Sequence, residues 1–382
     1  MRSLGRLGVA VHWVHPPARA AAAWSRYARG TVECDASASN QEVIERLVGL
    51  SRTLGGRPIL IPTDDLAVYL VDDEADRLRE CFLFPDQPRG LARQLSDKRA
   101  MHALCVEHGV STPETLFPRS NREALQLADD LSFPVVLKGI DTTVLGEQTG
   151  ARMAIVRSPE ELAQAYATFD ASEAGPGLMV QEYIPGPPHS VWMFNGYFDD
   201  KSRCLFGVSG RKLRQSPPYT GATSLGVCYP NPAVVDATVR LMDRVGYRGI
   251  LDIGYRFDDR DGRYKLLDVN PRLGATFRLF TSAEGLDVVR ALYLDLSGHP
   301  CPSDVARHGR KWLLETSDVA SAWKYRRDGR LTVRDWVRSL RGVEEAGWFA
   351  GYDPLPCARA YGSAILKSLR ANGKGAALAG ER

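Results

Sequence analysis

Three polar residues at alternate positions, Asp268, Asn270 and Arg272, end an apolar run in the second half of the chain. Alternate residues of a strand point to the same face, so the carboxylate and the amide should project together. Polar side chains on an apolar strand are costly unless they are hydrogen-bonded or bind a cation. Their oxygen atoms suit a hard cation such as Mg²⁺, and an arginine just beyond the strand can hold a phosphate or a carboxylate. This spacing therefore predicts a site for a metal and an anion.

A β-hairpin over residues 249–272 is the element that must position these groups. Its centre, at residues 258–262, carries the Asp-Gly pattern that reverses a chain. Period-two alternation predicts one face for each strand. The residues expected on these faces are Ile250, Asp252, Gly254 and Arg256 on the outgoing strand, and Tyr264, Leu266, Asp268 and Asn270 on the return strand.

Two lysines at the ends of expected elements are candidates for binding an anion. Lys98 lies in the first turn of a helix expected from Ser96-Asp97 to about residue 108, where the helix dipole favours acids. A solvated surface lysine fits that position as well. Lys138 ends an apolar strand over residues 132–139, so it must either reach outward to solvent or meet an anion.

Two further stretches could contact a nucleotide, although each has an ordinary structural explanation. Residues 139–150 form an expected loop containing Thr142 and Thr143, whose hydroxyls and backbone N–H groups can hold phosphate. A plain hairpin loop explains them equally well. Gln181 and Glu182 end an expected strand over residues 178–184, just before a Pro-Gly break, where a planar ligand or solvent alone can satisfy the strand end.

A basic run lies between residues 210 and 215. Arg211, Lys212 and Arg214 follow an expected strand over residues 205–209 and precede a Pro-rich loop. Such a run is either a solvated face or a surface that faces an anion, and the sequence does not choose between them.

The first part of the chain alternates strands and helices, which predicts a small parallel sheet. We expect strands at residues 7–14, near Val32 and at 57–62, and helices over residues 18–29 and 40–54. The G-x-G-x-x-G dinucleotide pattern is absent there. The basic, apolar and Ala-rich start mimics a signal peptide, but His12 and the prolines that follow favour a strand.

Composition narrows the functional class. The chain has 49 basic and 46 acidic residues, and the net charge of +3 does not suggest nucleic acid or a membrane as the main partner. Seven single cysteines without a C-x-x-C pair favour reduced thiols in a cytoplasmic protein. No apolar run is long enough to span a bilayer. A homodimer is the expectation for a soluble enzyme.

The order of these motifs resembles the ATP-grasp superfamily, in particular its carboxylate–amine ligases and carbamoyl-phosphate-synthetase-like members. The resemblance covers about residues 96–300 and implies an α/β and α+β protein, an ATP-grasp fold preceded by a small parallel-sheet α/β domain. Its expected parts are the preceding domain (1–95), a small lid lobe (96–183), a large lobe with the metal site (184–304) and a C-terminal extension packing on it (305–382).

The resemblance also implies roles for particular residues. ATP would be bound by two lysines, a threonine loop, a hinge and the residue after it, in this chain Lys98, Lys138, Thr142, Thr143, Gln181, Glu182, Tyr183, Ile184 and His189. Mg²⁺, with Mn²⁺ as a substitute, would be bound by Asp268, Asn270 and Asp252. The expected catalytic cations are Arg272, Lys212 and Arg211.

The implied reaction joins a small-molecule carboxylate to an amine: the carboxylate attacks the γ-phosphate of ATP, ADP leaves, and the amine displaces phosphate from the acyl phosphate. This chain departs from the family in two places. Gly254 stands where relatives usually carry an acidic metal ligand, and Pro188-His189 stands where a carboxylate commonly holds the ribose. Asp252, on the same face as Gly254, is the expected replacement. A degenerate nucleotide-binding protein and a small-molecule kinase remain alternatives.

Overall fold

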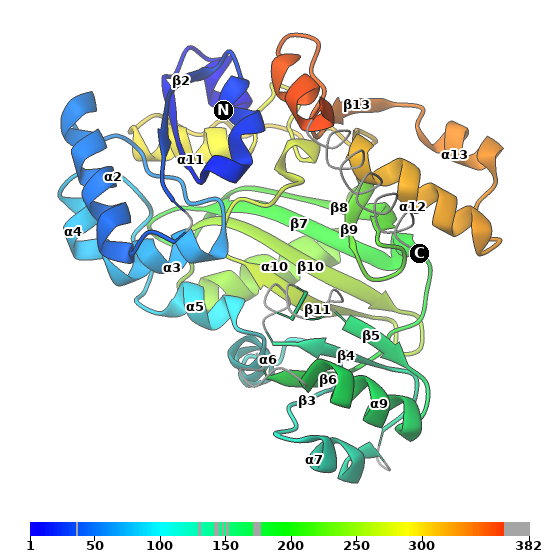
Figure 1. Cartoon of the computed structure of the whole chain (residues 1–382). Coiled ribbons are helices and arrows are strands. Elements are labelled where there is room, and N and C mark those ends of the chain that lie inside the picture. The colour runs from blue at the N-terminus through cyan, green and yellow to red at the C-terminus, as the bar shows by residue number, and fades with distance from the viewer. Residues whose placement is uncertain are drawn as a thin grey trace, which may run out of the picture.

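The computed structural model describes residues 1–35, 37–128, 131–140, 145–146, 149, 153–170 and 177–362. The described chain forms a two-stranded, a four-stranded and a seven-stranded sheet. Figure 1 shows the N-terminal part beside the large sheet and the four-stranded sheet below it. The described helices include none long and apolar enough to cross a membrane.

The described residues of the N-terminal part form one pair of parallel strands, β1 (Val11–His15) and β2 (Ala28–Glu33). The third strand expected over residues 57–62 is reduced to a single parallel bridge between Ile59 and Leu83. The remaining elements are helices, in chain order α1 (Arg2–Gly5), η1 (Pro17–Trp24), α2 (Asn40–Leu54), α3 (Asp65–Asp73) and α4 (Ala75–Arg79). The helix expected over residues 18–29 was therefore too long, because β2 begins at its end.

Helix α2 has the predicted bounds, and its capping explains why. The Ser39 side chain accepts a hydrogen bond from the Glu42 backbone N–H, while the Glu42 carboxylate accepts one from the Ser39 N–H. This reciprocal pair satisfies two backbone donors that the first turn leaves free. Ile44 and Leu47 then face the local core with Leu78 and Phe82.

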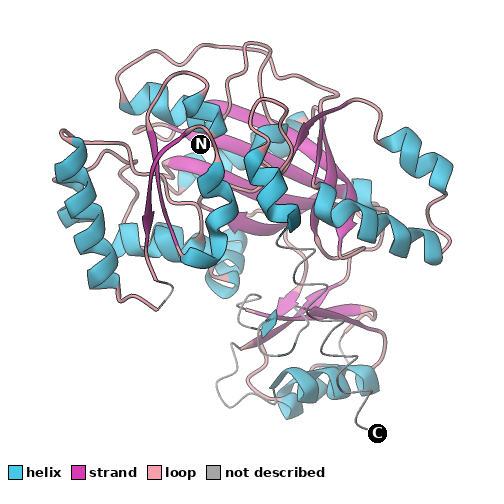
Figure 2. Ribbon diagram, turned by 45° about the horizontal axis from the view of Figure 1, so that its top comes forward, coloured by secondary structure: helices cyan, strands magenta, loops and turns pink. Residues whose placement is uncertain are grey.

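The small lobe is an antiparallel four-stranded sheet covered by helices on one face (Figure 2). Its elements are β3 (Thr115–Leu116), α7 (Asn121–Gln126), β4 (Val135–Gly139), β5 (Met153–Val156), α9 (Pro159–Asp170) and β6 (Leu178–Glu182). Leu137, Leu162, Tyr166 and Val180 are almost fully buried between this sheet and its helices.

The large sheet carries seven strands in the order β11-β10-β7-β8-β9-β12-β13, and its two faces are covered by different helices. The strands are β7 (Val191–Phe198), β8 (Cys204–Ser216), β9 (Ala222–Cys228), β10 (Gly249–Asp258), β11 (Arg263–Asn270), β12 (Lys311–Leu313) and β13 (Val343–Ala346). One face packs on α5 (Leu91–Ser96), α6 (Lys98–Glu107) and α10 (Pro232–Arg244), and the other on α11 (Val288–Leu296).

Helix α6 belongs with the large sheet, although the expected boundary at residue 96 assigned it to the small lobe. Its buried side chains Met101, Leu104 and Cys105 lie in the same core as Leu251 and Ile253 of β10. The chain crosses to the small sheet only afterwards, at β3. Lys98, at the start of α6, is therefore held by the large lobe.

The C-terminal extension continues the large sheet through β12 and β13 and adds α12 (Glu315–Arg327) and α13 (Val333–Ser339). A buried bidentate ion pair fastens it, with Arg214 Nε and Nη2 lying 2.8 and 2.9 Å from the two oxygens of Asp318. Ser224 Oγ and Trp336 Nε1 also donate to Asp318. Because each oxygen of this buried carboxylate has donors, the extension is anchored by a satisfied charge rather than by apolar contact alone.

Candidate functional site

A β-bulge in the hairpin decides which side chains reach the site. Gly254 pairs with Asp268, and Tyr255 pairs with Leu266, so Leu267 is an extra residue in the return strand. Such a bulge reverses the alternation beyond it. The expectation that Leu266 shares a face with Asp268 and Asn270 was therefore wrong: Leu266 and Val269 are buried in the core, whereas Asp268 lines a cleft.

This cleft lies between the small sheet and the large sheet and encompasses about 1020 Å³, part of it open to solvent. Eight of the sequence-predicted site residues line it, namely Lys98, Lys138, Gln181, Glu182, Tyr183, Ile184, Lys212 and Asp268. They come from α6, β4, β6 and the two residues after it, β8 and β11, so the fold brings together residues that are as far apart as 98 and 268.

Lys138 is buried on the small-sheet side of this cleft. Its Nζ donates to Gln181 Oε1 at 2.9 Å, and Gln181 Nε2 donates to Thr115 Oγ1 at 3.0 Å. Burial, together with the nearby charge of Lys98, lowers the pKa of Lys138 to about 8, although Asp268 opposes the change. A buried ammonium group whose hydrogen bond among the described residues goes to a neutral amide is well suited to meet an anion.

Two more lysines and Asp268 complete the charged wall. Asp97 caps α6 by accepting from the Ala100 N–H at 2.7 Å, which places Lys98 in the first helical turn. Lys212 Nζ donates to the Gly221 carbonyl at 3.2 Å. Burial acts to raise the pKa of Asp268, but the charges of Lys98, Lys212 and Lys138 outweigh it and hold that pKa below its usual value.

The two carboxylates of the expected metal site come from neighbouring strands. Asp252 lies opposite Asn270, and Asn270 Nδ2 is 3.2 Å from Asp268 Oδ2. Burial, followed by repulsion from Asp268, raises the pKa of Asp252 to about 6. Asn195 Nδ2 donates to Asp252 Oδ1 at 2.7 Å, and the other amide atom, Asn195 Oδ1, is buried without a hydrogen bond.

These donors fit Mg²⁺ as proteins commonly hold it, through one or two carboxylates with phosphate oxygens and water in the other positions. Two carboxylates whose charges repel each other gain from a cation placed near both. The fit does not extend to a site built from protein ligands alone, since no group of three or more His, Cys, Asp or Glu residues suited to a metal occurs among the described residues. Asp268, Asn270 and Asp252 are the residues that would hold it.

Gly254 has a structural reason to lack a side chain. A Cβ built there would lie far inside van der Waals contact of Asp268 Oδ1. A carboxylate side chain at position 254 therefore cannot coexist with Asp268 in its present position.

Besides Asp252, Asn270 and Arg272 at the metal end of the hairpin, three described residues that were predicted for the site do not line the cleft. The Arg211 guanidinium stacks over Tyr229 at 4.4 Å and over Trp192 at 5.9 Å from the ring centroids, so its expected catalytic position is not supported. His189 is exposed after the hinge and does not line the cleft. Arg214 forms a buried ion pair with Asp318 and does not line the cleft. Thr142 and Thr143 lie outside the described residues.

Arg272 forms an ion pair with Asp65 of the N-terminal part of the protein. Its Nε lies 2.6 Å from Asp65 Oδ1, and its Nη2 is 3.5 Å from Asn270 Oδ1. The carboxylate of Asp65 raises the pKa of Arg272 even though burial acts in the opposite direction. The guanidinium therefore stays charged beside the metal end of the hairpin.

Sequence reasoning missed two contributors to the cleft. Arg256 lines it, and its Nη2 donates to the Gly186 carbonyl at 2.9 Å. The sequence did offer a signal for Arg256, because it lies two residues after Gly254 and so is expected on the same face of the strand. The second contributor is the loop that follows β8, in which Tyr219, Thr220 and Gly221 line the cleft and Tyr219 has a φ of 71°. Left-handed backbone is unusual for a tyrosine, and such strain persists where the surroundings enforce it.

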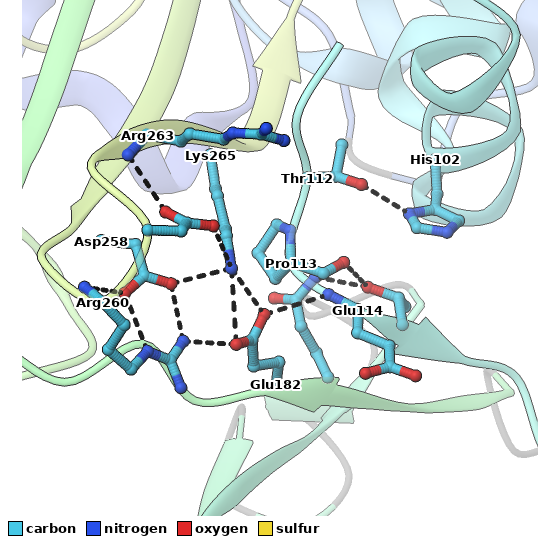
Figure 3. Close-up of polar contacts among 12 residues, drawn as sticks. His102, Thr112, Pro113, Glu114, Glu182, Asp258, Arg260, Arg263 and Lys265 are labelled. Atoms are coloured by element: carbon cyan, nitrogen blue, oxygen red, sulfur yellow. Dashed lines mark hydrogen bonds and ion pairs between the residues drawn. The ribbon is translucent and has the colours of Figure 1, made fainter. Parts of the chain in front are cut away.

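The Glu182 side chain is tied down by cations of the hairpin, as Figure 3 shows. Lys265 Nζ lies 3.1 Å from Glu182 Oε2 and 2.8 Å from Asp258 Oδ2. Arg260 bridges the same two carboxylates. Glu182 Oε2 also accepts from the Glu114 backbone N–H at 3.2 Å. Glu182 therefore joins the small lobe to the large lobe, and its carboxylate is not free to reach a base.

No family model matches the chain. A D-aspartate ligase of Enterococcus faecium is 25% identical over 244 residues, which cover 61% of this chain and 57% of that protein. An L-amino acid ligase from Bacillus licheniformis superposes with a TM-score of 0.58 at 15% identity, covering 77% of this chain and 70% of that one.

A second solved structure carries ligands. It is the biotin carboxylase domain of a 2-oxoglutarate carboxylase from Hydrogenobacter thermophilus, in complex with MgADP, ADP and bicarbonate. It superposes with a TM-score of 0.62 at 17% identity, covering 81% of this chain and 70% of that one. These likenesses confirm the predicted fold and resemblance: the chain has the ATP-grasp fold and resembles carboxylate–amine ligases. It spans little more than half of the D-aspartate ligase.

Proposed function

We propose that the protein is an ATP-dependent ligase that activates a small carboxylate as an acyl phosphate and joins it to an amine. The observation that carries this proposal is the convergence of Lys98, Lys138 and Lys212 on Asp268 inside one cleft of an ATP-grasp fold. Three cations around one carboxylate suit a triphosphate bound together with a metal ion. Phosphoryl transfer needs such positioning and charge neutralisation more than it needs a covalent side chain.

The chain's own residues divide the work as follows. Lys138 and Lys98 bind phosphate oxygens from the small-sheet side and from α6, while backbone groups of residues 181–184 border the base. Lys212 and Arg272 stabilise negative charge as the carboxylate oxygen attacks the γ-phosphate and ADP leaves. The amine then attacks the acyl carbon, releasing phosphate and a proton. Mg²⁺, when bound by Asp268, Asn270 and Asp252, supplies charge neutralisation between the phosphates.

We further propose that the substrates are amino acids or similar small molecules. The D-aspartate ligase and the L-amino acid ligase support this choice by their names. A cytoplasmic location is proposed because the described cysteines are all free thiols. A homodimer and substitution of Mn²⁺ for Mg²⁺ complete the proposal.

The test is ADP release by the purified full-length chain with ATP, Mg²⁺ and a matrix of amino acids and simple carboxylates. We expect ADP release that depends on both an acid and an amine. Asp268→Asn should lower kcat by roughly 10²- to 10³-fold, as is typical for losing a group that stabilises transition-state charge. Asp259→Asn is the matched control, because Asp259 is exposed in the turn of the same hairpin.

Two outcomes would overturn the ligase function. Tight nucleotide binding without ADP release for any pair would favour a non-catalytic nucleotide-binding protein, an alternative motivated by Gly254. A stable phosphorylated acid formed at the same rate without an amine would favour a kinase. A kcat for Asp268→Asn equal to that of Asp259→Asn would remove Asp268 from the mechanism.

A further inference from the structure

A second cavity lies on the other side of Arg272, between the N-terminal part and the start of β10. It encompasses about 750 Å³, part of which is open to solvent. Its apolar walls come from three places in the chain, with Ile61, Val68 and Val71 facing Ile250 and Leu292. Figure 1 shows α3, which carries Val68 and Val71, lying beside the large sheet.

The charged residues around this cavity are mainly basic. Four arginines and two aspartates line it, namely Arg79, Arg89, Arg248, Arg272, Asp72 and Asp86. These arginines are paired with aspartates, so the anionic end of a ligand must bind where a guanidinium keeps a hydrogen-bonding edge free.

Arg272 is the cation that connects this cavity to the phosphate and metal end of the cleft. It lines the cavity, while its Nη2 lies 3.5 Å from Asn270 Oδ1. Asn270 in turn lies 3.2 Å from Asp268, which lines the cleft. Ile250 is on the same face of β10 as Asp252, so the apolar wall of the cavity is next to the metal end of the hairpin.

Asp65 fixes the orientation of this arginine. Asp65 accepts from Nε at 2.6 Å and more weakly from Nη2 at 3.4 Å. Among the described residues, Nη1 donates to the Leu273 carbonyl alone, at 3.4 Å. An incoming carboxylate can therefore bind Nη1 without breaking the stronger contact. Planar guanidinium groups recognise carboxylates in this way.

We propose that this cavity is the subsite for the carboxylic acid substrate, and that it selects acids with a compact branched or aromatic body. The carboxylate binds Arg272 and faces the phosphate end, while the body packs against Val71, Val68 and Ile250. The part of the acid that packs against Val68, Val71 and Ile250 carries no second charge or amide, because a polar group placed there loses its hydrogen bonds to water. The amino acid of the proposed reaction is then the amine substrate. This subsite rests on the proposed ligase function for its catalytic meaning, but not for its binding.

The test is calorimetric titration of the full-length chain, without nucleotide, with 4-methylpentanoate, 3-phenylpropanoate and butanedioate. We expect saturable binding of the two apolar acids and at least tenfold weaker binding of butanedioate. Val71→Phe fills the cavity and should weaken both apolar acids by at least tenfold. Val71→Ala enlarges it and should shift the preference toward 3-phenylpropanoate. Leu66→Phe is the matched control, because Leu66 lies on the same helix and is 78% exposed.

The two Val71 variants keep the test informative if one of them fails to fold. No binding of either apolar acid to the wild type, or equal affinities in wild type, Val71→Phe and Val71→Ala, would overturn the subsite. Butanedioate binding as tightly as 4-methylpentanoate would overturn its apolar selectivity. Failure of the ligase is read separately, from ADP release. Acid binding without ADP release would contradict the proposed ligase function and would still support the subsite.

Discussion

The two cavities on either side of Arg272 differ in the chemistry of their walls, which are mainly charged in one and mainly aliphatic in the other. The cleft between the sheets is walled by three lysines, by Arg256, Asp268 and Glu182, and by strand-end backbone. Its Lys138 is buried, with a pKa lowered to about 8. The cavity behind it has aliphatic walls, and its arginines Arg79, Arg89 and Arg272 are all paired with aspartates. Unsatisfied charge is thus concentrated where a polyanion would bind, and charges elsewhere are neutralised. The contrast predicts that the two sites can be damaged independently.

Lys138→Met is expected to give the largest difference between the effects of one substitution on nucleotide binding and on acid binding. The change removes an ammonium group from the cleft while keeping the length of the side chain. Losing a hydrogen bond to a charged group costs about 1.5–3 kcal/mol, so we expect ADP to bind roughly 10- to 150-fold more weakly. Titration with a fluorescent ADP analogue measures this, and 4-methylpentanoate affinity should not change. Lys201→Met, at an exposed position, is the control.

The pH dependence of the same titration sharpens this prediction. The pKa of Lys138 is lowered to about 8, so the unliganded protein loses this positive charge as the pH rises through that value. Bound phosphate favours the charged form, so nucleotide affinity should fall between pH 8 and pH 10 in the wild type. The Lys138 component of that fall should vanish in Lys138→Met. Parallel pH profiles for the two proteins would contradict the assignment.

A smaller and purely local effect is expected for Gly254→Ala. The new Cβ meets Asp268 Oδ1, so the buried carboxylate must move. Such overpacking costs about 1–3 kcal/mol of unfolding free energy, measurable by chemical denaturation. Affinity for ADP with Mg²⁺ should fall, while binding of the apolar acid is retained.

Gly49→Ala provides the comparison for Gly254→Ala. Gly49 lies inside α2 with open space around its Cα, so alanine there should stabilise the protein by roughly 0.5–1 kcal/mol. Equal effects of the two substitutions would show that Asp268 does not fill the space beside Gly254.

The sequence predicted the strand-end residues of the cleft well, because their signal is local. Lys138 ends an apolar strand, and Asp268 follows a tight turn at the right spacing. The facing of Leu266 was mispredicted because the bulge at Leu267 depends on pairing with β10 rather than on local pattern.

Long-range contacts account for the other differences. Arg211, Lys212 and Arg214 formed one basic run in the sequence, yet β8 extends through it and sends each side chain to a different place. One stacks on aromatic rings, one lines the cleft, and one pairs with Asp318, which lies 104 residues away. The apolar cavity was equally hidden, since its walls come from residues between Ile61 and Leu292.

The smallest expected effect tests whether the C-terminal extension shapes the cleft. Tyr325 OH accepts a hydrogen bond from the Tyr219 backbone N–H at 3.1 Å, and the two rings lie 5.1 Å apart, edge to face. Tyr219 lines the cleft with a φ of 71°, so its strained backbone depends on partners supplied by α12. Tyr325→Phe keeps the ring contact and removes only the acceptor, which costs about 1 kcal/mol.

We expect Tyr325→Phe to raise the KM of the substrate that contacts the loop after β8 by roughly fivefold. This is the factor that corresponds to about 1 kcal/mol. The kcat should be nearly unchanged. Affinity for the apolar acid should stay at the wild-type value, because neither Tyr325 nor Tyr219 lines the cavity beside α3. Tyr361→Phe is a suitable control, since Tyr361 is a half-exposed tyrosine of the same extension and does not line the cleft. Equal kinetics for the two tyrosine variants would mean that the loop holds its strained conformation without the extension. A parallel loss of acid binding would mean instead that the two cavities are coupled.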